Sequence, residues 1–106
     1  MIYIWNDQKF NVKAYRTIYD NGSLHVYITD ESGRFFLSLS SNTYYSKYID
    51  SNEYAYVELN RLPDADRFIV YNHLGESTGS VRVIGRSKYY LYRFNIDNIK
   101  EKTLKF

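Results

Sequence analysis

Cysteine is absent from this chain of 106 residues, and proline occurs once. Without cysteine there is no disulfide framework, no thiolate chemistry and no zinc site built on cysteine ligands. No stretch approaches the roughly 18 apolar residues that a membrane-spanning helix requires. Residues 1–7 also lack the basic start and the apolar run of a signal peptide, so we expect a cytoplasmic protein.

The net charge is small, at +2, and does not by itself predict nucleic-acid binding. Its distribution is uneven, because residues 1–80 hold seven Lys and Arg against ten Asp and Glu, a balance of −3. Residues 81–106 hold seven against two, a balance of +5. This basic end is either a solvated edge strand and tail, where charge prevents aggregation, or a patch that faces an acidic partner.

Tyrosine is abundant, with 13 copies beside six Phe and one Trp. Aromatic residues favour strands, where the ring packs and a tyrosine hydroxyl reaches water or a partner. Tyrosine is also enriched in surfaces that bind other proteins. The composition therefore indicates a small β-rich module that presents tyrosine on its surface.

Apolar residues alternate with polar ones in seven segments, which predicts strands over residues 2–5, 9–19, 24–29, 34–40, 54–59, 81–84 and 88–96. Asn21-Gly22 predicts a type I′ hairpin turn, because both residue types tolerate positive φ. Residues 78–80 predict a turn or a bulge. Successive strands joined by short turns favour an antiparallel arrangement.

One short helix is predicted over about residues 64–74. Asp64 is a suitable N-cap, since its carboxylate can accept hydrogen bonds from the first turn, and Gly75 is suited to ending the helix. We therefore predict an α+β fold in which an antiparallel sheet of about six to seven strands packs against this helix. We expect a single domain over residues 1–106, in which the residues after Asp97 form either a frayed tail, residues 98–106, or one last turn with Ile99 and Leu104 docking.

No motif for catalysis or for metal binding is found. His25 and His73 lie far apart and fit no zinc-binding spacing, and no glycine-rich loop ends in the lysine that a phosphate site needs. Asp64 and Asp66 are explained by the helix start. We expect no catalytic residues, no metal and no cofactor, and thus a protein that is not an enzyme.

The basic C-terminal strands allow a nucleic-acid interpretation. Arginine and lysine beside aromatic residues are typical of single-strand binding platforms, in which bases stack on rings and cations hold phosphates. The residues of that alternative are Arg82, Arg86, Lys88 and Arg93. Tyr90 and Tyr92 fit the same chemistry, but they fit equally well as core rings of the last strand.

Several stretches resemble a known family. They are residues 21–40, residues 56–60, Leu74-Gly75 with Thr78-Gly79, and the closing Tyr90-x-Tyr92-x-Phe94. In order and spacing they resemble an uncharacterised family of small proteins, a domain of unknown function carried by phages and integrative elements of Gram-positive bacteria. The chain departs from that pattern at residues 60–62 and 87–89. The family defines no catalytic residues, so none is carried over.

The resemblance implies a setting in the bacterial host cytoplasm, where small accessory proteins of mobile elements often bind and block a host protein. We therefore predict a protein-binding module, an inhibitor of a host defence protein of the anti-CRISPR or anti-restriction type, acting by steric occlusion. Homodimerisation through a strand edge is compatible with this prediction. The partner-binding residues that we expect are Tyr44, Tyr45, Tyr48, Arg86, Lys88 and Tyr89, because tyrosine and arginine dominate interface energies.

Overall fold

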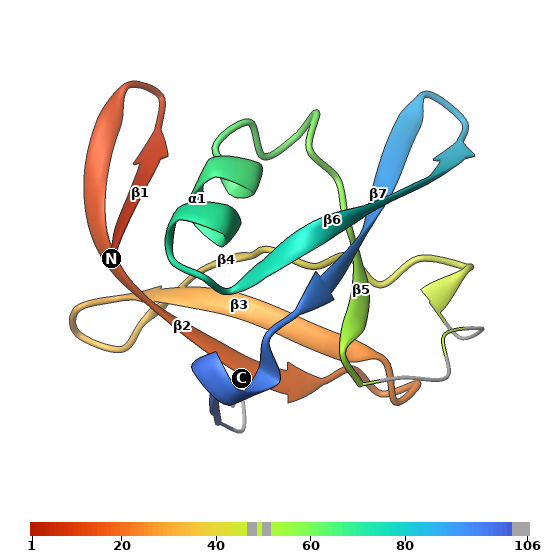
Figure 1. Cartoon of the computed structure of the whole chain (residues 1–106). Helices are drawn as coiled ribbons and strands as arrows, with labels where there is room; N and C mark the ends of the chain where they lie inside the picture. Colours follow the sequence, from red (N-terminus) through yellow and green to blue (C-terminus); the bar gives the residue numbers. More distant parts are fainter. Residues whose placement is uncertain (47–48, 50–51, 103–106) are drawn as a thin grey trace.

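The computed structural model describes residues 1–46, 49 and 52–102 (Figure 1). The predicted α+β class is confirmed, with mostly antiparallel strands and one α-helix over the described residues. The strands number eight in the described part of the chain, slightly more than expected. They form two sheets rather than the single sheet that we predicted.

The first sheet has the order β1-β2-β3-β4, and β8 pairs with β2 from outside this path. Its strands are β1 (Ile2–Trp5), β2 (Gln8–Ile18), β3 (Leu24–Asp30), β4 (Phe35–Ser38) and β8 (Lys100–Glu101). The neighbours along the path are antiparallel, whereas β8 runs parallel to β2. The centre of β3 is buried on both faces, so this strand forms the middle of the sheet.

The second sheet has the order β5-β7-β6, with all neighbours antiparallel. Its strands are β5 (Tyr54–Val57), β6 (Gly75–Ile84) and β7 (Ser87–Phe94). The pairing of β6 with β7 shifts between Ser77 and Val81, where Gly79 has a φ of 87°. The bulge expected at residues 78–80 is therefore confirmed, but the strand begins earlier than the sequence indicated.

The hairpin turn at Asn21-Gly22 differs from the predicted type. A type I′ turn needs positive φ at both central residues, yet only Gly22, at 84°, has it. The Tyr19 N–H donates to Ser23 O, and the Gly22 N–H donates to Tyr19 O. These bonds close a longer loop in which Asn21 keeps a negative φ and its side chain accepts from Ser23 N–H.

Helix α1 (Ala65–Tyr71) is shorter than predicted. Asp64 stands at the N-cap position, but its side chain makes no capping hydrogen bond to the helix. Gly75 does not end the helix, because His73 takes the left-handed conformation with a φ of 56° and Gly75 already begins β6. A tight approach to β7 explains the glycine instead, since a Cβ there would lie 2.5 Å from Arg93 O.

The core lies between the two sheets and against α1. The helix contributes Ala65, Phe68 and Ile69, all fully buried. Tyr3, Phe68 and Phe36 meet edge to face, with Tyr3 packing between the other two rings. The remaining core residues are Val12, Ala14, Leu24, Val26, Ile28, Leu39, Ala55, Val57, Leu62, Leu74, Tyr92, Phe94 and Ile99.

Of the two forms expected for the C-terminal segment, a frayed tail or one last turn, the described residues up to 102 show the turn. A 3₁₀ turn (Ile96–Asn98) leads into β8, and Ile99 is buried as expected. Arg16 holds this segment through its Nε, which donates to Ile99 O at 2.9 Å and to Ile96 O at 3.3 Å. Leu104 and the rest of residues 103–106 lie outside the described part of the chain.

Candidate functional site

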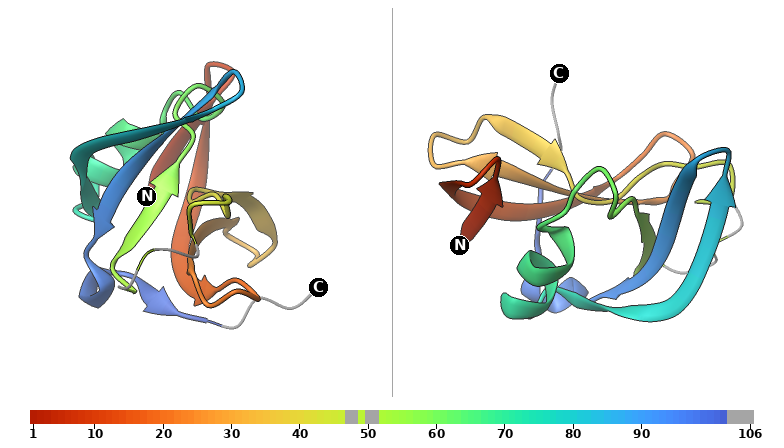
Figure 2. Two further views of the ribbon diagram at one scale, coloured as in Figure 1. Left: turned by 90° about the vertical axis from the view of Figure 1, so that its right-hand side faces the viewer. Right: turned by 90° about the horizontal axis from the view of Figure 1, so that it is seen from above.

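The β6–β7 hairpin extends beyond the body of the molecule, with β6 outermost in its sheet (Figure 2). Nine of the ten residues of β6 are exposed, including Val81 at 45% and Val83 at 59%. Gly85, with a φ of 60°, starts the two-residue turn that joins Ile84 to Ser87. Val81, Val83 and Ile84 place three exposed apolar side chains close together on one short stretch, so the hairpin is a candidate interaction surface.

The loop that follows β4 lies against this hairpin. The Arg82 guanidinium stands over the Tyr45 ring at 5.2 Å, and Tyr44 meets Tyr45 edge to face at 5.5 Å. Tyr89 is directly opposite Arg82 in the ladder and therefore shares its face of the sheet. Tyr44, Tyr45, Arg82 and Tyr89 form one surface, which we call the Tyr–Arg face. Three of the predicted partner-binding residues belong to it, and Arg82 came from the nucleic-acid alternative.

The other predicted partner-binding residues lie elsewhere. Lys88 pairs with Val83 and projects from the opposite face of the hairpin, because successive residues of a strand alternate. Arg86 stands in the turn at the tip, between the two faces. Both cations are exposed, and neither makes an ion pair among the residues that the structure describes. Tyr48 lies outside the described residues.

Only some of the residues of the nucleic-acid alternative lie together and are accessible. Arg82 and Arg93 share a face, but Arg93 is 3.6 Å from the Glu53 carboxylate and stands opposite Glu76. Tyr92 is fully buried, with its hydroxyl donating to Asp66, so its ring offers no platform for a base. The hairpin keeps three exposed basic residues for which no ion pair is found among the described residues: Arg82, Arg86 and Lys88.

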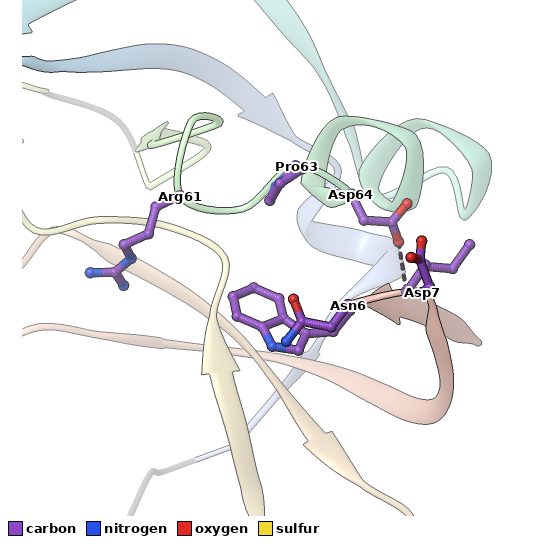
Figure 3. Close-up of a pocket in the computed structure, with 7 residues that line it drawn as sticks. Asn6, Asp7, Arg61, Pro63 and Asp64 are labelled. Atoms are coloured by element: carbon purple, nitrogen blue, oxygen red, sulfur yellow. Dashed lines mark hydrogen bonds between the residues drawn. The ribbon is translucent and has the colours of Figure 1, made fainter.

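A groove that the sequence did not indicate lies between the β1–β2 turn and the loop before α1 (Figure 3). A hollow of about 600 Å³ is lined by Ile4, Trp5, Asn6, Asp7, Arg61, Pro63 and Asp64. A second hollow of about 310 Å³ shares Trp5 and Arg61 with it and adds Phe10, Phe36, Leu37 and Leu62. The only available signal was the single Trp, placed directly before the Asn6-Asp7 turn.

The groove lining holds no catalytic constellation. Its chemical groups are two carboxylates, one guanidinium, one amide and apolar rings, without a nucleophile and base in contact. Asp64 is committed to structure, because it accepts from Ile4 N–H at 2.8 Å and from Arg67 at 2.6 and 2.8 Å. Burial alone would raise the pKa of the Asp64 carboxyl, but these hydrogen bonds outweigh it and hold the pKa below its usual value.

We expect Asp64→Asn to lower the free energy of unfolding by about 1–2 kcal/mol, because it weakens charge-assisted hydrogen bonds that join β1 to α1. Asp7→Asn is the matched control, since it removes a carboxylate from the same groove without breaking a bond to Ile4 or Arg67. Urea denaturation measures both variants. Equal stabilities for the two would contradict a structural role for Asp64.

The two histidines occupy different surroundings. His25 is buried, with its Nε2 2.7 Å from Ser38 Oγ and its ring stacked 4.1 Å from that of Tyr19. Burial lowers the pKa of His25 to about 4. His73 is exposed at the end of α1. Among the described residues, no group of three or more His, Cys, Asp or Glu side chains could hold a metal ion.

Comparison with protein-family models, with curated proteins and with solved structures finds no match for this chain. Over the described residues, the structure contains no helix with the length and apolar character needed to cross a membrane.

Proposed function

We propose that this protein is a non-enzymatic protein-binding module of a phage or mobile element that inhibits a host defence protein, of the anti-CRISPR or anti-restriction type, by steric occlusion. The cellular setting comes from the sequence resemblance. The binding role has a separate physical basis in the exposed hairpin and the Tyr–Arg face.

The contact between Arg82 and Tyr45 is the observation that carries the proposal. It joins a loop and a hairpin that are distant in the sequence into one surface of aromatic rings and a guanidinium. Tyrosine and arginine are the residue types that contribute most to binding at the centres of protein interfaces. The contact between the rings of Tyr44 and Tyr45 reduces the side-chain freedom that binding would cost.

The charge of the hairpin favours a partner with an acidic surface. Residues 77–94 contain four Arg and Lys and no Asp or Glu. Complementary charge accelerates association and selects the partner, while the rings supply the apolar contact area. Tyr92 is buried and Arg93 is paired, so two of the residues suited to a single-stranded nucleic acid are not available to it, which favours an acidic protein as the partner.

The proposal is tested by affinity capture of the tagged protein from a Gram-positive bacterial lysate, with and without nuclease, followed by mass spectrometry. We expect one stoichiometric protein that survives nuclease. The double variant Tyr45→Ala/Tyr89→Ala should weaken its binding by at least about 2 kcal/mol, or roughly thirtyfold in Kd, as hot-spot truncations do.

The matched control is Phe35→Ala/Tyr71→Ala, which removes two exposed aromatic side chains away from the Tyr–Arg face. It should leave the Kd within about twofold, since residues outside an interface contribute little. Equal weakening by both double variants would contradict the assigned face. Capture of many ribosomal or nucleoid proteins that are lost on nuclease treatment would instead indicate nucleic-acid binding.

A further inference from the structure

The outer edge of β6 is an unusual feature of the second sheet. On one side β6 pairs with β7, and on the other no strand of the described chain pairs with it (Figure 2). Proteins commonly protect such edges with bulges, prolines or lysines. The bulge at Gly79 protects only the first half of β6, and residues 81–84 continue as regular ladder with two exposed valines.

The register of β6 with β7 shows which backbone N–H and C=O groups of residues 81–84 make no hydrogen bond to β7. Ile84 and Ser87 flank a two-residue turn, and such a turn is closed by a hydrogen-bonded pair. Bonded and non-bonded pairs alternate along an antiparallel ladder. Arg82 and Ile84 therefore direct their N–H and C=O groups to β7, whereas Val81 and Val83 direct theirs away from the sheet.

The side chains along this edge specify the chemistry of a matching strand. Val81 and Val83 project from one face of β6, and Arg82 projects from the other. A strand added beside them would place apolar residues next to the valines and, one position along, an acidic residue next to Arg82. Arg86 and Lys88 stand nearby without ion pairs among the described residues, so acidic residues are favoured there too.

A second copy of this chain fits the edge poorly. Antiparallel pairing of two β6 strands would bring the Arg82, Arg86 and Lys88 of both copies into one small region, and no acidic residue lies between positions 77 and 94 to compensate. Like charges placed opposite one another destabilise a strand pair. The edge is thus better matched to a segment of a different protein.

The geometry points to a strand-addition site: an extended segment of the partner, with apolar and acidic residues in alternation, pairs with residues 81–84 of β6 and becomes the fourth strand of the second sheet. Main-chain hydrogen bonds to Val81 and Val83 provide the affinity, and Arg82, Arg86 and Lys88 select acidic sequences. This inference deepens the proposed function, on which it rests, by giving the partner segment and its mode of binding.

The probe for this site is a short fluorescein-labelled peptide in which valine and glutamate alternate. Its control has the same composition, with all valines in one block and all glutamates in another. We expect fluorescence anisotropy to show that the alternating peptide binds at least about tenfold more tightly, and that its binding weakens with added salt. Equal affinity for the two peptides would show that only charge is recognised.

Two variants separate the backbone from the side chain. Val83→Pro and Val83→Ala both lose the valine, but only proline removes the outward N–H, and an edge strand tolerates proline where the N–H faces solvent. We expect Val83→Pro to lose at least about tenfold in peptide affinity relative to Val83→Ala. Melting curves establish that both variants are folded. Equal affinities for the two variants would overturn the proposal.

A direct readout uses the wild-type protein and avoids any loss of stability. In amide hydrogen exchange followed by NMR, bound peptide should protect Val81 and Val83 and leave Arg82 and Ile84 unchanged, since those two already bond to β7. Protection at all four positions, or at none, would contradict the register. Light scattering that shows a dimer dissociated by Val83→Pro would assign the edge to a second copy instead.

The captured partner separates this inference from the proposed function. If the partner binds Val83→Pro as tightly as Val83→Ala but loses affinity for Tyr45→Ala/Tyr89→Ala, strand addition is wrong and the Tyr–Arg face stands. If the peptide binds as expected and no protein partner is captured, the edge is a strand-addition site and the proposed inhibitor role is wrong.

Discussion

Replacing Gly75 with alanine is expected to lower the free energy of unfolding by about 3 kcal/mol, which is a large part of the stability of a domain of this size. A Cβ at this position would lie 2.5 Å from Arg93 O and 3.0 Å from Phe94 Cα. Both contacts are with backbone atoms, so no side-chain rotation relieves them. The two strands must separate just where Asn95 N–H donates to Leu74 O at 2.7 Å.

Gly79→Ala on the same strand is the matched control. Gly79 has open space around it but a φ of 87°, so alanine there costs only the strain of a left-handed conformation, about 1–2 kcal/mol. Chemical denaturation of the two variants at one pH and temperature gives the comparison. A smaller loss for Gly75→Ala than for Gly79→Ala would show that the close approach of β6 to β7 is not as tight as described.

Acidification is expected to remove up to about 3 kcal/mol of stability through His25 alone. The pKa of His25 falls from 6.5 to about 4 in the folded protein, because burial disfavours the charged imidazolium. The unfolded chain therefore binds more protons than the folded one between these values. The contribution of His25 is complete above pH 6.5, declines as the pH falls, and is lost below about pH 4.

The pH dependence of the free energy of unfolding, measured in urea from pH 7.5 down to about pH 4, tests this prediction. His25→Gln should remove the slope in that window, even if it also lowers stability at neutral pH. His73→Asn, which changes the exposed histidine, should keep the slope and tolerates the positive φ at that position. An unchanged slope in His25→Gln would show that another group causes the acid sensitivity.

The alternation of apolar and polar residues predicted the strands well, because it depends only on which side chains of a single segment face the core. The first strand matches residue for residue, and the 24–40 hairpin appears as β3 and β4. Division into two sheets was missed, because it depends on which strands meet at long range. The start of β6 was missed for a different reason: residues 75–80 are small, polar and exposed, so they show no apolar alternation.

The candidate site shows the same limit. Tyr44, Tyr45 and Tyr89 were proposed from composition alone, since tyrosine is enriched at interfaces. Arg82 lies beside Tyr45 because the loop after β4 packs onto the β6–β7 hairpin. A local sequence pattern does not reveal such a long-range contact. Lys88 does not share the face of Tyr89, because neighbours on a strand point to opposite faces. The N-cap position of Asp64 was predicted correctly, although its carboxylate binds Ile4 and Arg67 rather than the free N–H groups of the first turn. The C-terminal boundary of the helix was wrong, because Gly75 serves a close contact to β7 and already begins β6.

The hydrogen bonds from Arg16 to the C-terminal segment also determine the order in which the protein can be assembled. The β1–β2 and β2–β3 hairpins need only nearby residues, and hairpins form within microseconds. Arg16 and β8, in contrast, meet across almost the whole chain. During synthesis, which makes the N-terminal residues first, the first sheet waits for residues 96–101 before its last strand can be added. Pairing in the first sheet can thus start before the strands of the second sheet have been made, but it is completed only after them, when β8 is added.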